Sequence, residues 1–225
     1  MQNLTGQKLV NFKRLPQGRK QTYANNLKKP VDKTESGGDY WISSVSALAN
    51  ACKNNDVKII STKIDFLLSQ VKATANKRTK DMYQRNIDIL TGYKEYDFRK
   101  LKPKKSTGFE TRSNTKYILT LKGFSVQVFP SHVYTYRNEE TDEVGGVWFV
   151  AKLGGFKNDE LDIFSELLYK YLLANYSKKH TINPSFCSAI DVVNRKESRY
   201  SKIIDNNSQS VLDMTLTDLK KYLNK

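Results

Sequence analysis

The chain has 225 residues, of which 38% are hydrophobic and 11% aromatic, and this composition excludes a disordered protein. Its longest apolar runs are far shorter than the roughly 20 residues of a membrane span, and its N-terminus lacks the apolar stretch of a secretory signal. The formal net charge is +15, and the two cysteines, Cys52 and Cys187, stand apart, so we expect a basic cytoplasmic protein with reduced thiols.

Residues 1–38 are predicted to form a basic arm. Pro16, Gly18 and Pro30 interrupt the segment and no apolar period is sustained, which is typical of a chain that is loosely ordered alone. Residues 1–35 carry eight basic and two acidic side chains, a net +6. We expect the arm to follow a phosphate backbone, and a solvated or self-packed tail is the alternative. Its proposed nucleic-acid contacts are Lys13, Arg14, Arg19 and Lys20.

Residues 39–112 are predicted to be a helical region that forms a small bundle. Apolar residues recur at helical spacing within 42–52, 64–71 and 82–93, which indicates three helices. The expected first residues or caps of these helices are Asp39, Ser61 or Thr62, and Thr79.

Basic residues flank the third predicted helix, and aromatic residues lie among them. Residues 77–116 carry twelve basic and five acidic side chains, a net +7. Cations among aromatic rings can neutralise phosphates and stack on bases, although the same rings can belong to the core. The segment 100–105 around Pro103 is predicted to be a loop and is the leading candidate for phosphate contact. The proposed contacts here are Lys77, Arg78, Lys80, Arg99, Lys100, Lys102, Lys104, Lys105 and Arg112.

Residues 113–225 are predicted to be β-rich, with a mainly antiparallel sheet packed by one long helix. Segments rich in β-branched and aromatic residues occur at 117–121, 124–129, 133–137, 147–153 and 185–193. Residues 138–146 are expected to be a water-facing acidic loop, closed by Gly145 and Gly146. Asn158 is expected to cap the long helix, and Thr215 begins a short last helix. The predicted fold class is therefore α+β.

One face of the predicted sheet has two interpretations. Alternation places His132, Tyr134 and Tyr136 on one face of a strand, and Trp148, Val150 and Lys152 on the expected matching face of the next. If this face is open, it is a stacking platform for single strands. Otherwise it is the half-buried face of a sheet.

The β-β-β-α-β order of residues 117–193 resembles the restriction-endonuclease-like core, over about a third of the chain. The resemblance implies an acid at one strand end and another acid two positions before a lysine on the next strand, which hold Mg²⁺. Here Lys152 ends a predicted strand, but Val150 stands two positions before it. The chain also lacks a serine–histidine elbow, a zinc-ligand spacing and a Walker loop, so no catalytic residue, metal or cofactor is predicted.

The leading hypothesis is a non-catalytic protein that binds DNA or RNA through the phosphate backbone. The cations comprise 29 Lys and 9 Arg, which favours phosphate contact over base recognition and hence low sequence specificity. The same excess also fits a generally basic composition. Two alternatives are kept: an adaptor that docks a protein through its neutral C-terminal half, and a divergent metal-dependent nuclease. An exposed apolar patch on the helix at 161–172 would favour the adaptor.

Overall fold

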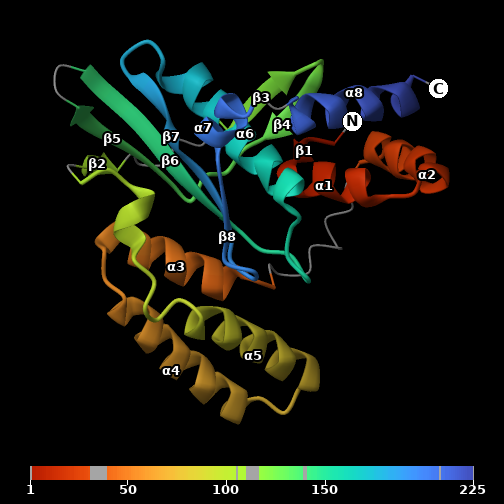
Figure 1. The fold of residues 1–225 in the computed structure, drawn as a ribbon. Coiled ribbons are helices and arrows are strands. Elements are labelled where there is room, and N and C mark those ends of the chain that lie inside the picture. The colour runs from red at the N-terminus through yellow and green to blue at the C-terminus, as the bar shows by residue number, and fades with distance from the viewer. Residues whose placement is uncertain are drawn as a thin grey trace.

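The computed structural model describes residues 2–30, 40–104, 106–109, 117–138, 141–207 and 209–224. As predicted, the fold class is α+β, and the structure has helices around two mixed sheets (Figure 1). In chain order the elements are β1 (Leu4–Thr5), α1 (Gly6–Arg14), α2 (Gln17–Lys28), α3 (Ile42–Asn54), α4 (Lys58–Ala73), α5 (Lys77–Thr91), the 3-10 helix η2 (Phe98–Leu101), β2 (Ser106–Phe109), β3 (Ile118–Leu121), β4 (Phe124–Gln127), β5 (His132–Asn138), β6 (Thr141–Val150), α6 (Asn158–Tyr176), β7 (Thr181–Asp191), β8 (Lys196–Arg199), α7 (Tyr200–Asp205) and α8 (Val211–Leu223). None of the helices within these ranges combines the length and apolar character that a bilayer crossing requires.

The larger sheet has the strand order β2-β5-β6-β7-β8. β6 and β7 are parallel and joined through α6, whereas the other neighbouring pairs are antiparallel. A parallel pair requires a crossover, and the 19 residues of α6 supply it. The carboxyl ends of β6 and β7 therefore lie at the same edge of the sheet.

Helices cover both faces of this sheet, as Figure 1 shows. Side chains alternate along a strand, so Val144 and Val150 of β6 join the core around α6, whereas Val147 and Phe149 join the core with α3, α4 and α5. α6 is covered on its other side by α1 and α8. Its apolar residues from Leu161 to Leu172 are buried, except for the half-buried Tyr169, so this helix does not offer the exposed patch that would favour the adaptor hypothesis.

The N-terminal segment differs from the predicted loose arm. Residues 6–14 and 17–28 are helices α1 and α2, and Leu9, Val10 and Phe12 are buried against α6 and α8. Two local features favour this structure: Thr5 Oγ1 accepts a hydrogen bond from the Lys8 N–H at the start of α1, and Pro16 precedes the first turn of α2. α1 has only nine residues, and α2 has only three apolar ones, Tyr23, Ala24 and Leu27, so neither helix forms a clear apolar period in the sequence.

The predicted β region divides into two sheets. β3 and β4 form a hairpin that pairs with β1 in a separate three-stranded sheet, whereas β5 and β6 belong to the larger sheet. The expected acidic loop at 138–146 is wrong over most of its length, because β6 begins at Thr141 and Val144, Gly145 and Gly146 are buried strand residues.

Gly145 permits a close approach that a side chain would prevent. A Cβ atom at this position would lie 2.7 Å from Phe186 Cβ and 2.9 Å from Phe186 O. We predict that Gly145→Ala lowers the free energy of unfolding by about 1 to 3 kcal/mol, because the packed interior must shift to accept the methyl group. Urea denaturation followed by circular dichroism measures this change. Gly18→Ala is the control, because a Cβ at this exposed helical position meets nothing within 4 Å and should leave the stability equal or raised.

Candidate nucleic-acid interface

Three of the four cations proposed in the arm form ion pairs inside the molecule. Lys13 Nζ lies 2.5 Å from Asp159 Oδ2, and Lys20 Nζ lies 2.6 Å from Asp218 Oδ2. Arg14 binds the Glu160 carboxylate through two hydrogen bonds of 2.7 and 2.6 Å. These contacts attach α1 and α2 to α6 and α8. Arg19 is exposed on α2, so the structure does not bring the four cations together for an outside ligand.

The edge at the carboxyl ends of β6 and β7 carries the lysine of the nuclease hypothesis. Lys152 Nζ donates a hydrogen bond of 2.6 Å to Asn11 Oδ1, and burial, together with the nearby charge of Arg14, lowers the pKa of this lysine. The buried Asp191 carboxylate accepts hydrogen bonds from the N–H groups of Phe156 and Val193. Within the described ranges, no three His, Cys, Asp or Glu side chains are placed to hold a metal ion.

The aromatic face of β5 is covered. Tyr134 is 1% and Tyr136 5% exposed, the Tyr134 hydroxyl donates to Leu101 O, and His132 Nε2 lies 2.8 Å from Ala49 O. In the β5–β6 register His132 pairs with Val147, whereas Trp148 lies on the opposite face and contacts Phe164 edge to face. The strand residues proposed as one platform therefore belong to two faces, and both are packed.

Buried carboxylates give the protein a pH dependence with two opposing parts. Burial raises the pKa of Glu166 above its ordinary value of 4.5, against the hydrogen bond from Ser210. Burial also disfavours ionised Glu143, but hydrogen bonds from Tyr136, Asn138 and Asn183 outweigh it and lower the pKa of that carboxyl. A carboxyl whose pKa is raised by folding destabilises the fold as pH rises through that pKa. A carboxyl whose pKa is lowered by folding stabilises the fold, and this stability is lost as pH falls through that pKa.

We therefore predict that the free energy of unfolding rises as pH falls from neutral through the raised pKa of Glu166, and that it decreases as pH falls below 4.5 through the lowered pKa of Glu143. Urea titrations at a series of pH values measure this curve. Glu166→Gln should flatten the rise and leave the acid limb unchanged, whereas an unaltered rise in that variant would assign it to other groups.

The start of α5 carries three exposed cations, Lys77, Arg78 and Lys80, which we name the α5 cluster. Asn76 caps the helix, and its side chain accepts a hydrogen bond of 3.0 Å from the Thr79 N–H. Within the described part of the chain, no member of the cluster forms an ion pair. The first turn also contains no acidic residue, so positive side chains meet the positive end of the helix dipole.

A second group of cations surrounds η2, and we name Lys53, Lys100, Lys102 and Lys104 the η2 corner. Lys102 Nζ donates to Cys52 O and Lys53 O, which holds the segment after η2 against the end of α3. The ammonium groups of Lys53 and Lys102 each lie 5.6 Å from the centre of the Phe109 ring. Lys100 Nζ lies 4.2 Å from the centre of the Tyr96 ring, and Lys104 is exposed.

Three further candidates do not add to this corner. Arg99 forms an exposed ion pair of 2.8 Å with Asp97, whereas Lys105 and Arg112 lie outside the described residues.

Sequence reasoning also missed Phe109. Its role beside two lysines depends on α3, which is about 50 residues earlier in the chain, so no local pattern could have indicated it.

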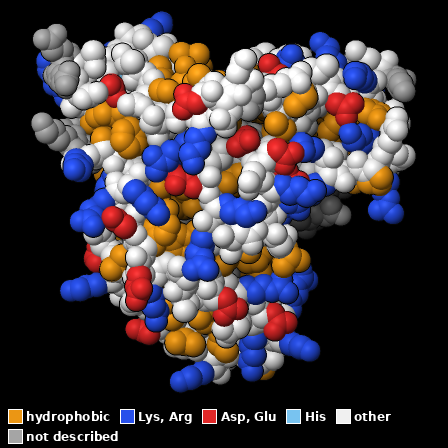
Figure 2. Space-filling model, in the orientation of Figure 1, with side chains coloured by type: hydrophobic (Ala, Val, Ile, Leu, Met, Phe, Trp, Pro, Cys, Tyr) orange, Lys and Arg blue, Asp and Glu red, His pale blue; other side chains and the backbone are white. Residues whose placement is uncertain are grey.

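The helical layer as a whole is basic without being uniformly so. Residues 40–104 contain 13 Lys and Arg against 6 Asp and Glu, a net +7. Figure 2 shows blue side chains distributed around the lobe of α3, α4 and α5, with acidic side chains among them. The charge is therefore spread over two groups at different places on the layer, which suits an extended polyanion more than a small anion.

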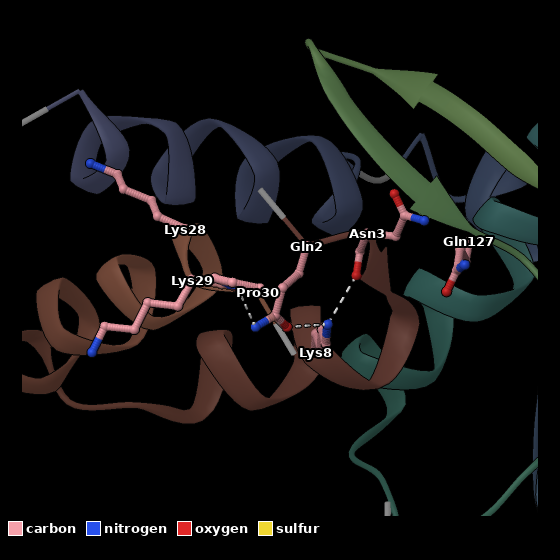
Figure 3. Close-up of a pocket in the computed structure, with 7 residues that line it drawn as sticks. All are labelled: Gln2, Asn3, Lys8, Lys28, Lys29, Pro30 and Gln127. Atoms are coloured by element: carbon pink, nitrogen blue, oxygen red, sulfur yellow. Dashed lines mark hydrogen bonds between the residues drawn. The ribbon is translucent and has the colours of Figure 1, made fainter. Parts of the chain in front are cut away.

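A hollow beside the N-terminus, with a volume of about 530 Å³, is less suited to hold a phosphate. It is lined by Lys8, Lys28 and Lys29, but Lys8 Nζ is bound to Gln2 Oε1 at 2.7 Å and to Asn3 O at 3.0 Å. Figure 3 shows the other two lysines extending away from Lys8. The three charges do not converge on one point.

Comparison with known proteins leaves the interpretation to these residues. No protein-family model, curated protein or solved structure matches this chain.

Proposed function

We propose that this protein binds nucleic acid through the phosphate backbone, with the α5 cluster and the η2 corner as its contact groups. The observation that carries the proposal is the α5 cluster. Cations at the N-terminal end of a helix oppose its dipole and cost about 0.3 to 1 kcal/mol each at the surface. A bound phosphate would reverse this unfavourable arrangement, because it attracts both the side chains and the unpaired N–H groups of the first turn.

The composition of the two groups supports binding without base recognition. Lysine is a flexible point charge, whereas reading of guanine favours the planar fork of arginine. The α5 cluster holds one arginine, and the η2 corner holds none. Phe109 is partly covered by Lys53 and Lys102, so a base has little free ring face there. We therefore expect similar affinities for unrelated sequences.

A salt series tests the proposal with the full-length protein. Labelled single-stranded and double-stranded DNA and RNA of mixed sequence are titrated, and binding is followed by fluorescence anisotropy. We expect micromolar binding at low salt and a slope of log K against log salt of about −4 or steeper for duplex DNA, as about five neutralised phosphates would give. Absence of binding at the lowest salt would refute the proposal.

The second contact group has its own variant. Lys100→Glu with Lys104→Glu removes two exposed cations and leaves Lys102, which holds the end of α3, in place. Affinity should decrease for every sequence alike, and the salt slope should decrease by about 2. An unchanged slope would remove the η2 corner from the interface and leave the α5 cluster alone.

A further inference from the structure

We propose that a separate pocket, between α5 and the carboxyl ends of β6 and β7, binds a nucleoside monophosphate or the terminal nucleotide of a strand. The pocket has a volume of about 340 Å³, which lies within the range of small-molecule sites. Ligands commonly bind beyond the carboxyl ends of parallel strands, where the connecting loops leave a crevice. This inference is independent of the proposed backbone binding.

The lining combines an aromatic and apolar part with a charged part. Trp41, Ile89 and Val193 contribute the apolar part, and the half-buried Trp41 ring also lies edge to face against Tyr40, with 4.8 Å between the ring centres. Arg85 of α5 and Arg195 of the β7–β8 connection contribute guanidinium groups. An indole can stack on a base, and guanidinium groups suit the oxygens of a phosphate.

Neither arginine is neutralised by a carboxylate in the part of the chain that the structure describes. The Arg85 guanidinium lies 5.6 Å from the centre of the Tyr40 ring, and Arg195 Nη1 donates a long hydrogen bond of 3.4 Å to Gly92 O. Both side chains are exposed and retain donors for a ligand. With Asp88 in the same lining, the charged residues Arg85, Arg195 and Asp88 give the pocket a net charge of +1, which favours an anion.

Backbone strain is a second and independent observation at this place. Arg195 has a φ of 57°, in the left-handed region that Gly and Asn occupy more readily than arginine. Strained residues of this kind concentrate at functional sites, where a side chain is held in a required position. Here the turn directs an arginine into the pocket lining.

Asp88 limits the ligand to a single phosphate. Its carboxylate lies in the lining with the two arginines and accepts a hydrogen bond of 2.8 Å from Gln84 Nε2. A carboxylate repels further phosphates but can accept a hydrogen bond from a base amino group or a sugar hydroxyl. A monophosphate with its base on Trp41 uses each of these groups.

Isothermal titration calorimetry of the full-length protein with adenosine 5′-monophosphate tests the site at low salt. We expect a Kd below about 1 mM, and weaker binding by about tenfold for adenosine and for ribose 5-phosphate, which each lack one half of the ligand.

Arg195→Asn removes the guanidinium but keeps a residue suited to a positive φ, so the turn should persist. We expect this variant and Arg85→Gln each to weaken binding by about tenfold, and Arg195→Lys to retain part of it.

Further outcomes distinguish this pocket from the backbone interface, and distinguish a strand end from a free nucleotide as its ligand. Glu substitutions in the α5 cluster should leave the binding of the mononucleotide unchanged. If a 5′-phosphorylated oligonucleotide binds more tightly than its unphosphorylated form, and Arg195→Asn abolishes that difference, the ligand is a strand end. If phosphorylation has no effect while the mononucleotide binds, the ligand is a free nucleotide. No saturable mononucleotide binding, or binding that both arginine variants retain in full, would overturn the proposal.

Discussion

Simultaneous replacement of Lys77, Arg78 and Lys80 by Glu is expected to weaken nucleic-acid binding by about 10- to 100-fold at moderate salt and to reduce the salt slope by about 3 for duplex DNA. Each substitution removes a cation from the start of α5 and places a charge there that repels phosphates. The same change suits the helix dipole, so the melting temperature should stay equal or rise. Weaker binding by a protein that is no less stable cannot be attributed to unfolding.

A matched control is available in the nearly neutral C-terminal half of the chain. Lys178, Lys179 and Lys221 are exposed, and their replacement by Glu changes the charge by the same −6, from +15 to +9. If the α5 cluster contacts phosphates, this control should retain most of the affinity at moderate salt, because long-range charge is largely screened there. Equal losses in the two variants would indicate that binding depends on net charge alone, and the assignment of the α5 cluster would then be wrong.

The helical layer was predictable because its signals are local. The apolar spacing that predicted the three helices matches α3, α4 and α5. Asn86, within the predicted segment 82–93, is 1% exposed and bound through its side chain to Ser44 N, Tyr40 O and Met82 O. The predicted starts were less accurate. α4 begins at Lys58, whose N–H is bound by Asp56 Oδ1, and α8 begins after Ser210, four residues before Thr215.

The N-terminal segment and the charged positions could not be predicted in the same way. A cation that pairs with an acid 146 residues away has the same sequence signature as one that faces water, as Arg14 and Arg19 illustrate. Likewise, alternation placed His132 and Trp148 on matching faces, but the register that separates them follows from the pairing of whole strands. Sequence patterns therefore located the cations, and only tertiary contacts divided them into paired and available groups.

The ion pair between α1 and α6 should be one of the strongest single contributions to stability. Arg14→Met is expected to lower the free energy of unfolding by about 2 to 4 kcal/mol, because among the described residues it leaves the buried Glu160 carboxylate with only the Lys157 N–H as a hydrogen-bond partner. The estimate lies below that for a fully buried pair because the Arg14 side chain is 34% exposed. Urea denaturation should show a lower midpoint with an unchanged slope.

Two variants isolate the cause. Arg14→Met with Glu160→Gln removes the buried charge but keeps an acceptor for Lys157 N–H, so a large part of the lost stability should return. Lys13→Met makes the same substitution one residue earlier, where the partner Asp159 is 48% exposed, and should cost less than about 1 kcal/mol. Similar losses for Lys13→Met and Arg14→Met would contradict this account. Arg14 holds α1 in place, so Arg14→Met should also leave the nucleic-acid affinity unchanged under conditions in which the variant is folded. A loss of affinity in the folded variant would indicate that Arg14 contacts nucleic acid.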